Sequence, residues 1–422
     1  MLQQIEPTLK VRGNLVVGQS GNRSAVFNAC LYGVIQEAQQ HPEIQNIYGM
    51  ADGVGGLLKG DLINLGRQNP TILENLKNAP SAALPSNRDA LIDADYKRAL
   101  EICKQNKIRF VIYMGDKGAM STADQLAEFA EAEGYPLCCI GVPHSVENTL
   151  GFTDHCFGYG TAARANAIVV RNVGRDAETM DGTASVKIIE TVGRNSGWLA
   201  AATALAKDSD DTAPHLIYLP ESGLDPTQFL ADVEAVCQRL SYCIVVISEG
   251  VKDKNGRILH PETAPGGCLG EYLCELLADQ LQLKASWDKL EDLSRFATQS
   301  ASIVDSGEAL MAGQAAVRRA VDGMNGFMIT IARHLDPNKP YSSLIGMVRL
   351  GLGARSEKVV SEAFINEAGN FVTEAFEKYA VPLIGGRLPA TLEPDPIGKD
   401  VRLAPIPVSP PTEKTEKGIS SL

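Results

Sequence analysis

The stretch that decides the fold is FVIYMGDKGAMST, residues 110–122. Residues 110–114 form an apolar run, which predicts a β-strand buried on both faces. A turn that contains Gly115 and Gly118 follows, and the segment 122–133 then has the composition of a helix. A buried strand that ends in a glycine-rich turn and leads into a helix is typical of parallel α/β sheets.

The same alternation continues on both sides of this stretch. Further apolar runs predict strands at 15–17, 137–142, 186–191, 216–219 and 243–247, and helical patterns predict helices at 95–107, 197–207, 227–240 and 308–322. Strands that alternate with helices in this way form βαβ units, so the sequence predicts a doubly wound α/β fold.

Composition limits the possible functions. The chain has 422 residues, enough for about two to four domains or two large lobes. Apolar residues make up 44% and charged residues 21%, as in folded globular proteins. With 39 Lys and Arg against 51 Asp and Glu, the net charge of -12 disfavours a general surface for nucleic acid or anionic membranes. We therefore expect neither nucleic acid nor a membrane as a partner.

The first residues lack the apolar core of a signal peptide, and no run approaches the roughly 20 apolar residues that cross a bilayer. The nine cysteines include no C-x-x-C pattern, and Cys138 and Cys139 are adjacent within an apolar run. We expect a cytoplasmic protein with reduced thiols, without disulfides or zinc.

The turns after the predicted strands hold the candidate binding residues. They cover residues 18–24, 115–122, 141–149 and 193–198. Ligands of doubly wound folds bind beyond the carboxyl ends of the strands, so these four turns could face one cleft. Glycine-rich turns that lead into helices present free N–H groups, which suit phosphate, and Arg88, Arg164 and Arg194 could add positive charge.

An ordered series of motifs carries a family resemblance. The series is Gln19-Ser20-Gly21, GYPLCCIGVP at 134–143, TDHCFGYGTAA at 153–163, ETVGRNSGWLAA at 190–201, Pro220-Glu221 and SEG at 248–250. With these motifs the sequence resembles the phosphofructokinase family, most closely its pyrophosphate-dependent branch, from about residue 15 to about residue 386.

The resemblance implies two doubly wound, Rossmann-like lobes with the active-site cleft between them. The expected N-terminal lobe, on the phosphoryl-donor side, holds 1–160 and about 296–345. The expected C-terminal lobe, on the sugar-phosphate side, holds 161–295 and about 346–404. Prolines and polar residues at 405–422 predict a flexible tail.

Family members transfer a phosphoryl group from pyrophosphate or ATP to the 1-hydroxyl of fructose 6-phosphate, with Mg2+. Their P-K-T-[IV]-D-N-D motif aligns with residues 143–149 of this chain. Glu147 stands at the position of the catalytic base and is an altered base, one methylene longer than Asp. His144 replaces the motif's Lys, and Thr149 replaces its second Asp. The resemblance adds Arg194 to the catalytic set.

The family's metal and phosphate turn, G-G-[DN]-[DG]-S, aligns with residues 115–119. Lys117 stands where the family has a metal-side Asp or Asn, and a cation there repels Mg2+. Asp116 is the one candidate metal ligand, if the protein is active and uses Mg2+. The resemblance gives the donor and phosphate site as Gly21, Asn22, Arg88, Gly115, Lys117 and Gly118.

The sugar-phosphate side keeps more of the family pattern. Gly193 and Arg194 match the family's M-G-R motif, and Glu249 matches the carboxylate that holds the sugar hydroxyls. The resemblance gives the sugar-phosphate site as Ser145, Gly193, Arg194, Glu249 and Arg295.

Three functional hypotheses follow. In the first, the protein binds fructose 6-phosphate or a similar sugar phosphate with weak or no catalysis, as a pseudoenzyme or regulatory subunit. In the second, it is an active pyrophosphate-dependent fructose-6-phosphate 1-phosphotransferase of glycolysis with Glu147 as the base. In the third, it is a transferase with a changed donor or sugar. The expected partners are a sugar phosphate, pyrophosphate or a nucleotide, and either further copies in a homo-oligomer or a catalytic paralogue.

Overall fold

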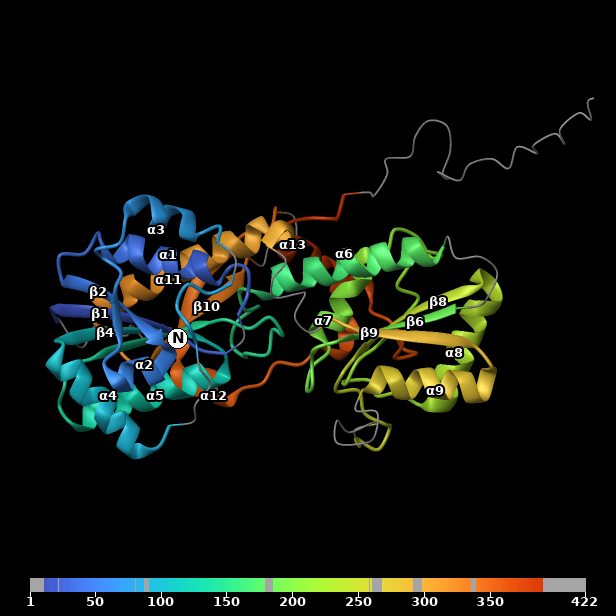
Figure 1. The fold of residues 1–422 in the computed structure, drawn as a ribbon, viewed down its shortest axis with the longest axis horizontal. Helices are drawn as coiled ribbons and strands as arrows, with labels where there is room; N and C mark the ends of the chain where they lie inside the picture. The colour runs from blue at the N-terminus through green and yellow to red at the C-terminus, as the bar shows by residue number, and fades with distance from the viewer. Residues whose placement is uncertain are drawn as a thin grey trace, which may run out of the picture. The chain divides into compact units, whose positions relative to one another are not determined.

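The computed structural model describes residues 11–21, 23–79, 81–86, 91–178, 185–257, 259, 268–290, 298–334 and 339–389. The chain divides into two compact units, Met1–Leu388 and Pro389–Leu422. All the helices and strands named below belong to the first unit (Figure 1). The predicted tail at 405–422 lies outside the described residues.

A seven-stranded sheet has the order β11-β10-β5-β4-β1-β2-β3. The strands are β1 (Gly13–Gln19), β2 (Ile44–Asp52), β3 (Leu62–Asn64), β4 (Ile108–Gly115), β5 (Cys138–Pro143), β10 (Phe327–Arg333) and β11 (Ser343–Arg349). The strands from β10 to β2 are parallel, and β3 and β11 run antiparallel at the edges. Met114 of β4 lies opposite Gln19 of β1, so both strands end at one edge of the sheet.

Two apolar cores cover the faces of this sheet. Leu15 and Val17 of β1 pack in one core and Val16 in the other, as the alternation of a strand requires. Helices α1 (Phe27–Ala38), α3 (Pro70–Leu76) and α11 (Ile303–Val321) contribute to the first core. Helices α2 (Gly53–Lys59), α4 (Asp93–Gln105), α5 (Lys117–Ala132) and α12 (Leu350–Arg355) contribute to the second.

A second, four-stranded sheet has the order β7-β8-β6-β9, and its pairings are all parallel. Its strands are β6 (Ser185–Thr191), β7 (Leu216–Tyr218), β8 (Tyr242–Ser248) and β9 (Lys284–Lys289). Helices α6 (Tyr159–Ala177), α7 (Trp198–Ala202) and α13 (Glu374–Leu383) contribute to the core on one face, with the 3-10 helix η1 (Thr203–Ala206). Helices α8 (Pro226–Leu240) and α9 (Leu269–Leu281) contribute to the core on the other face. Short 3-10 helices lie at η2 (Thr298–Ser300) and η3 (Glu362–Phe364).

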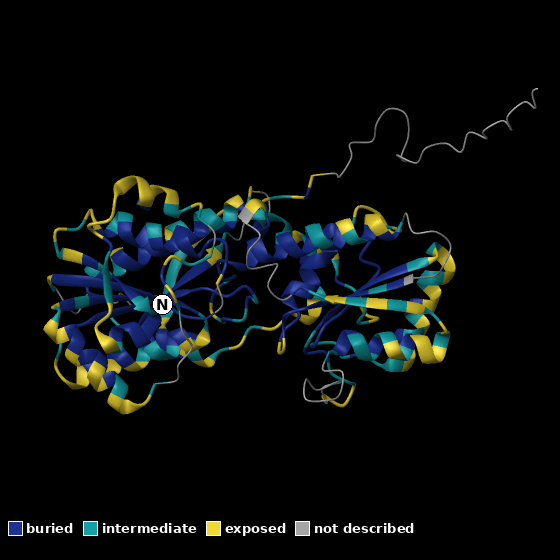
Figure 2. Ribbon diagram, in the orientation of Figure 1, coloured by how far each residue is buried: buried dark blue, intermediate teal, exposed yellow. Residues whose placement is uncertain are grey.

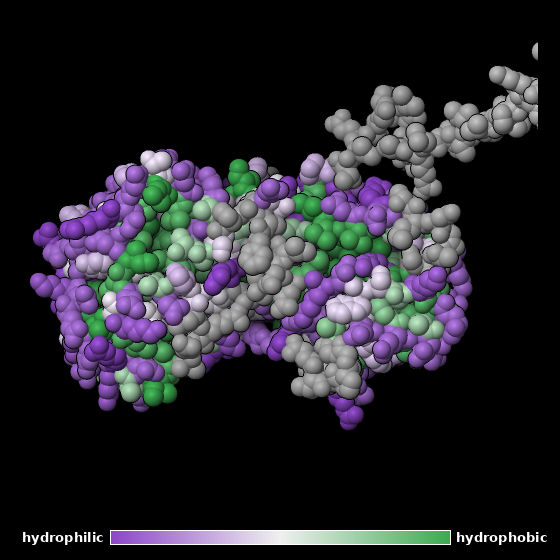
Figure 3. All heavy atoms as spheres, in the orientation of Figure 1, coloured by the Kyte–Doolittle hydropathy of each residue, from purple (hydrophilic) through white to green (hydrophobic). Residues whose placement is uncertain are grey.

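This architecture confirms the predicted α/β fold class, with parallel strands and helices on both faces of each sheet. In Figure 2 the strands are mostly buried, and exposed residues gather on the outer faces of the helices. Figure 3 shows hydrophilic residues interspersed with apolar ones on the face in view. Within the described residues, no helix is both long enough and apolar enough to cross a bilayer. The division into donor-side and sugar-side lobes stays a prediction.

Two helices begin several residues earlier than predicted: α11 begins at Ile303 and not at 308, and α5 begins at Lys117 and not at 122. The segment 115–122 was expected to be a turn before a helix at 122–133, but α5 begins at Lys117. The reason is local, because Asp116 acts as the N-cap and its carboxylate accepts hydrogen bonds from the amides of Gly118 and Ala119. Much of the predicted turn is therefore the first part of the helix.

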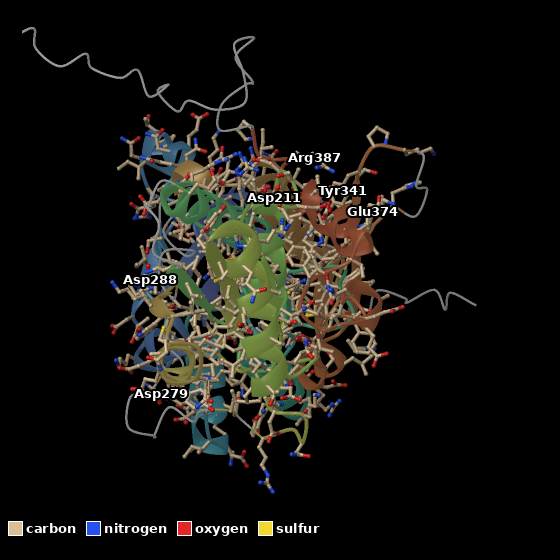
Figure 4. The ribbon with its side chains drawn as sticks, turned by 90° about the vertical axis from the view of Figure 1, so that its right-hand side faces the viewer. Asp211, Asp279, Asp288, Tyr341, Glu374 and Arg387 are labelled. Atoms are coloured by element: carbon tan, nitrogen blue, oxygen red, sulfur yellow. The ribbon has the colours of Figure 1, made fainter. Side chains whose placement is uncertain are left out.

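A buried charged cluster connects the loop before α6 to helix α11, to strand β10 and to the segment before β11. His155 is 1% exposed; its Nδ1 lies 2.8 Å from Asp154 Oδ2, and its Nε2 lies 2.6 Å from Glu308 Oε2 on α11. Tyr341 donates to Glu308 at 2.6 Å, and Arg333 of β10 lies 3.3 Å from Asp154. Tyr341 is labelled in Figure 4.

The two carboxylates favour the charged imidazole in this cluster. Burial by itself favours the neutral ring, but the hydrogen bonds that the ring donates to Asp154 and Glu308 raise the pKa of His155 above its ordinary value. Burial also opposes ionisation of Asp154, yet His155 and Arg333 lower the pKa of that carboxyl to about 2. The cluster is thus a paired imidazolium between two carboxylates, which is costly to break from one side.

We predict that His155→Gln lowers the free energy of unfolding by about 3 kcal/mol at about pH 6. Because the folded pKa of His155 is raised, its stabilisation is complete below the unfolded value of about 6.5 and is lost as pH rises through the folded value. The difference between parent and variant, measured by urea unfolding, should therefore shrink as pH rises.

His41→Gln is the matched control, because His41 pairs with Glu37 on the surface of α1 and is 23% exposed. Its effect should be small, because a partly exposed ion pair contributes little to stability. A difference for His155→Gln that stays constant from about pH 5 to about pH 9 would contradict the charged pairing.

Candidate functional site

The turns that follow β1 and β4 touch through their glycines. A Cβ placed on Gly115 would lie 2.5 Å from the carbonyl oxygen of Ser20, and one on Gly21 would lie 2.6 Å from the Asp116 carboxylate. Gly21 also has a φ of +83°, which side chains rarely allow. The structure therefore brings together Gly21, Gly115 and Asp116, as the sequence motifs predicted.

Asp116 is used to begin helix α5. Its Oδ1 accepts hydrogen bonds from the backbone N–H of Gly118 at 3.0 Å and of Ala119 at 3.4 Å. These amides are among the free donors at a helix N-terminus, where a bound phosphate would otherwise find them. The Asp116 carboxylate therefore occupies part of the anion-binding capacity of this turn.

Lys117 is the first residue of α5, and its side chain is half exposed. Its Nζ lies 4.0 Å from the Glu357 carboxylate, and that carboxylate also accepts a hydrogen bond of 2.8 Å from Asn195. Glu357 thereby links the predicted donor turn to the predicted sugar-phosphate turn. The sequence analysis missed Glu357, because it lies in an extended segment after α12 that carries no recognisable motif.

His144 is buried beneath the turn at 143–149. Its Nε2 lies 2.8 Å from Ser24 Oγ, and its ring lies 4.1 Å from the ring of Phe27 and 5.0 Å from that of Phe157. Burial lowers the pKa of His144 to about 3, so the ring is neutral at pH 7. This position therefore supplies no positive charge to a donor phosphate.

The rest of this turn is held by uncharged groups. Asn148 is fully buried with a φ of +55°, accepts from the amide of Cys156 at 3.0 Å and donates to Tyr379 at 3.1 Å. Ser145 Oγ lies 3.2 Å from Thr149 Oγ1. Glu147, next to Asn148, is partly buried. The structure thus holds the neighbours of Glu147 rigidly at the end of β5.

A pocket of about 510 Å³ opens at these turns. Its lining residues are Ser20, Leu91, Tyr96, Tyr113, Asp116, Lys117, Gly118, Ser121, Thr122, Gln125 and Thr149. Of the predicted donor residues, Lys117 and Gly118 therefore share one cavity with Asp116, the candidate metal ligand, and with Thr149. The two tyrosines that line the pocket, Tyr96 of α4 and Tyr113 of β4, were not predicted as site residues. Both elements were predicted from their apolar patterns, which do not indicate a binding role.

The described residues of this pocket do not fit Mg2+. Asp116 is the one carboxylate among the lining residues, its Oδ1 caps α5, and the ammonium of Lys117 is adjacent in the chain. Within the described part of the chain, no group of three or more His, Cys, Asp or Glu side chains is arranged to hold a metal ion. At phosphoryl-transfer sites Mg2+ is held by one or two carboxylates together with substrate phosphates and waters, and here the one lining carboxylate already caps a helix beside an ammonium.

On the predicted sugar-phosphate side, Gly193 and Glu249 meet. The backbone N–H of Gly193 donates to Glu249 Oε1 at 3.2 Å, and Ser248 donates to the Gly193 carbonyl at 2.6 Å. Arg194 is 68% exposed, and its Nε lies 3.9 Å from the same Glu249 oxygen. The turn therefore presents a guanidinium and a carboxylate side by side.

Lys289 at the end of β9 also contacts Glu249, at 3.2 Å. The sequence analysis missed this residue, because it matches no motif of the family. Three predicted site residues, Asn22, Arg88 and Arg295, lie outside the described residues.

Comparison with known proteins agrees with this architecture. The family description "Phosphofructokinase" matches residues 14–320. The chain is 34% identical to the pyrophosphate--fructose 6-phosphate 1-phosphotransferase of Xanthomonas campestris pv. campestris, covering 94% of this chain and 97% of that protein. It is 29% identical to the sulfofructose kinase of Alkalicoccus urumqiensis, covering 84% and 92%. The crystal structure of the pyrophosphate-dependent phosphofructokinase from Marinobacter aquaeolei superposes with a TM-score of 0.81 at 33% identity, covering 89% of this chain and 92% of that one. The chain therefore belongs to the phosphofructokinase family.

Proposed function

We propose that this protein binds fructose 6-phosphate or a similar sugar phosphate in the cytoplasm and transfers phosphoryl groups weakly or not at all. The observation that carries the proposal is the state of the donor turn, where Asp116 caps α5 and Lys117 stands in place of a metal-side carboxylate. Phosphoryl transfer depends on a metal and fixed cations that neutralise the developing charge. The donor turn provides the ammonium of Lys117 where that mechanism needs a metal and several fixed cations.

The turn at 143–149 supports the same conclusion. His144 is neutral at pH 7 because it is buried, and Thr149 supplies a hydroxyl where the family has a carboxylate. Glu147 keeps a carboxylate, but its extra methylene moves the oxygens by about 1 Å, which can lower a rate roughly 100-fold. These changes act on the same step, so their effects combine.

The sugar-phosphate side supports retained binding. Glu249 is oriented by the amide of Gly193, so its remaining acceptor capacity suits sugar hydroxyls. Arg194 is exposed and planar, which suits a phosphate. A family member that binds the sugar phosphate without efficient transfer would serve as a regulatory subunit, either in a homo-oligomer or with a catalytic paralogue.

An active pyrophosphate-dependent fructose-6-phosphate 1-phosphotransferase is the second candidate. It is favoured by the carboxylate of Glu147 at the base position and by the similarity to the phosphotransferase of Xanthomonas campestris pv. campestris. In that case Glu147 would take the proton of the sugar hydroxyl, and Oδ2 of Asp116, the oxygen that does not cap α5, would be the candidate ligand for Mg2+.

A changed donor or sugar is the third candidate. A cavity of about 510 Å³ with two tyrosines is larger than pyrophosphate needs and could hold a nucleotide. The relative named sulfofructose kinase indicates that sugars other than fructose 6-phosphate should be tested.

We predict that the purified protein, with Mg2+ and either pyrophosphate or ATP, forms fructose 1,6-bisphosphate from fructose 6-phosphate at a rate no higher than the background rate of the assay. The triple variant Lys117→Asp, Glu147→Asp, Thr149→Asp should raise the rate at least about tenfold, because it restores carboxylates at positions 117 and 149 and the shorter carboxylate at position 147. His144 is left unchanged, because a lysine there would have to enter the space between Phe27 and Phe157. Coupled spectrophotometric detection of the bisphosphate gives both rates.

Glu147→Gln in the parent is the control for contaminating activity. Turnover of ordinary enzymatic size, about 1 per second or more, that is abolished by Glu147→Gln would overturn the proposal and establish the second candidate.

We predict saturable binding of fructose 6-phosphate, measured by isothermal titration calorimetry, and about tenfold weaker binding by Glu249→Gln, because a hydrogen bond to a charged acceptor is lost. Glu234→Gln on the exposed face of α8 is the matched control and should bind like the parent. Equal affinities for parent and Glu249→Gln would remove Glu249 from the site.

A further inference from the structure

Lys289 occupies the last position of β9, directly opposite Glu190 of the neighbouring strand β6. Both strands end at the edge of the second sheet from which the turn of Gly193 leaves. Lys289 is 23% exposed, and Glu190 is 3% exposed. A lysine held this far from water needs a partner for its charge.

Two carboxylates provide that partner. The Lys289 ammonium lies 3.2 Å from Glu249 Oε2 and 3.7 Å from Glu190 Oε1. The other oxygen of Glu190 accepts a hydrogen bond of 2.9 Å from the backbone N–H of Gly270 at the start of α9. A continuous series of one hydrogen bond and two ion pairs thus connects the start of α9 to Glu190, Glu190 to Lys289, and Lys289 to Glu249.

The two oxygens of Glu249 have different partners. Oε1 accepts from the backbone N–H of Gly193 and lies near Arg194, whereas Oε2 faces Lys289. These contacts at both carboxylate oxygens restrict the conformations that the Glu249 side chain can adopt. Lys289 therefore helps to decide which way the carboxylate of Glu249 faces.

Lys289 also balances charge. Burial raises the pKa of Glu190, and the nearby charge of Glu249 adds to this, whereas the Gly270 amide and Lys289 act in the opposite direction. Without Lys289, two carboxylates would face each other across a partly buried space beside the turn that is proposed to bind a phosphate. Like charges at such a site repel an anionic ligand.

We propose that Lys289 is a positioning residue of the sugar-phosphate site, which orients Glu249 toward the Gly193 turn and offsets its charge so that an anionic sugar is accepted. This inference rests on the proposed binding of a sugar phosphate. It assigns a role to a residue outside the motifs that the resemblance supplied.

The structure offers a closely matched control. Lys187 of β6 is 24% exposed and pairs with Asp288 at 2.7 Å. Because side chains alternate along a strand, Lys187 and Asp288 lie on the face of the sheet opposite to Glu190 and Lys289. Asp288 is 59% exposed and is labelled in Figure 4. Lys187→Met therefore removes an equivalent paired lysine from the same sheet without touching Glu249.

The experiment compares the parent, Lys289→Met, Lys289→Arg and Lys187→Met. Calorimetric titration with fructose 6-phosphate should give about tenfold weaker binding for Lys289→Met, because a charged partner of Glu249 is lost. Lys289→Arg should restore most of the affinity, and Lys187→Met should bind like the parent. Raising the salt concentration should weaken parent binding more than Lys289→Met binding, because the variant has lost one screened attraction.

A second measurement needs no ligand. The backbone amide of Gly193 donates to Glu249, so its NMR resonance reports the position of that carboxylate. Lys289→Met should shift this resonance, Lys289→Arg should return it toward the parent position, and Lys187→Met should leave it in place. Urea unfolding of each variant identifies a general loss of structure.

The outcomes separate the two proposals. If the parent binds fructose 6-phosphate and Lys289→Met binds it equally well, with the Gly193 resonance unmoved, the role of Lys289 is overturned and the proposed function stands. If the parent binds no sugar phosphate, the proposed function and the charge-balancing role both fail. The Gly193 resonance then decides by itself whether Lys289 positions Glu249.

Discussion

The candidate donor site depends on close contact between two glycine turns. The backbone at Gly115 lies against Ser20, and the backbone at Gly21 lies against the carboxylate of Asp116, at distances that leave no room for a side chain. Because β1 and β4 are parallel neighbours, this contact fixes where both strands end. It also fixes the start of α5, and with it the positions of Lys117 and of the pocket beside it.

The sequence predicts most of the buried parallel strands, although β10 was not predicted despite the apolar run within Phe327–Arg333. The physical reason for the successful predictions is plain for β4 and β8. Both are covered by helices on each face, so nearly every residue is apolar. Strand β9 was not predicted, because KASWDK alternates exposed and partly buried side chains and so carries no apolar run. Strand β2 was missed for a similar reason, since Gln45 and Asn46 are exposed within it. The start of α5 depends on one hydrogen-bonding side chain, Asp116, which an apolar pattern cannot reveal.

The candidate site was predicted only where its residues fall in motifs. Gly21, Gly115 and Asp116 come together because motif residues at strand ends meet at one sheet edge. Lys289 and Glu357 could not be found in this way, because each reaches the site from a segment far away in the sequence. Their roles depend on register and on side-chain direction, which only the folded chain defines.

The two sides of the site use their charged groups differently, and this difference supports binding over transfer. On the donor side, charge is neutralised within the protein, because Asp116 caps α5, Lys117 faces Glu357 and His144 is held neutral. On the sugar-phosphate side, Lys289 also neutralises Glu249, but the Glu249 carboxylate remains directed at a turn that carries an exposed arginine. A ligand on the donor side must displace the helix cap and the Lys117–Glu357 pair. A ligand on the sugar side must share Glu249 with Gly193 and Lys289, but it meets an arginine whose side chain is 68% exposed. The phosphofructokinase fold is compatible with either outcome, so the activity of this chain depends on these side chains and not on its scaffold.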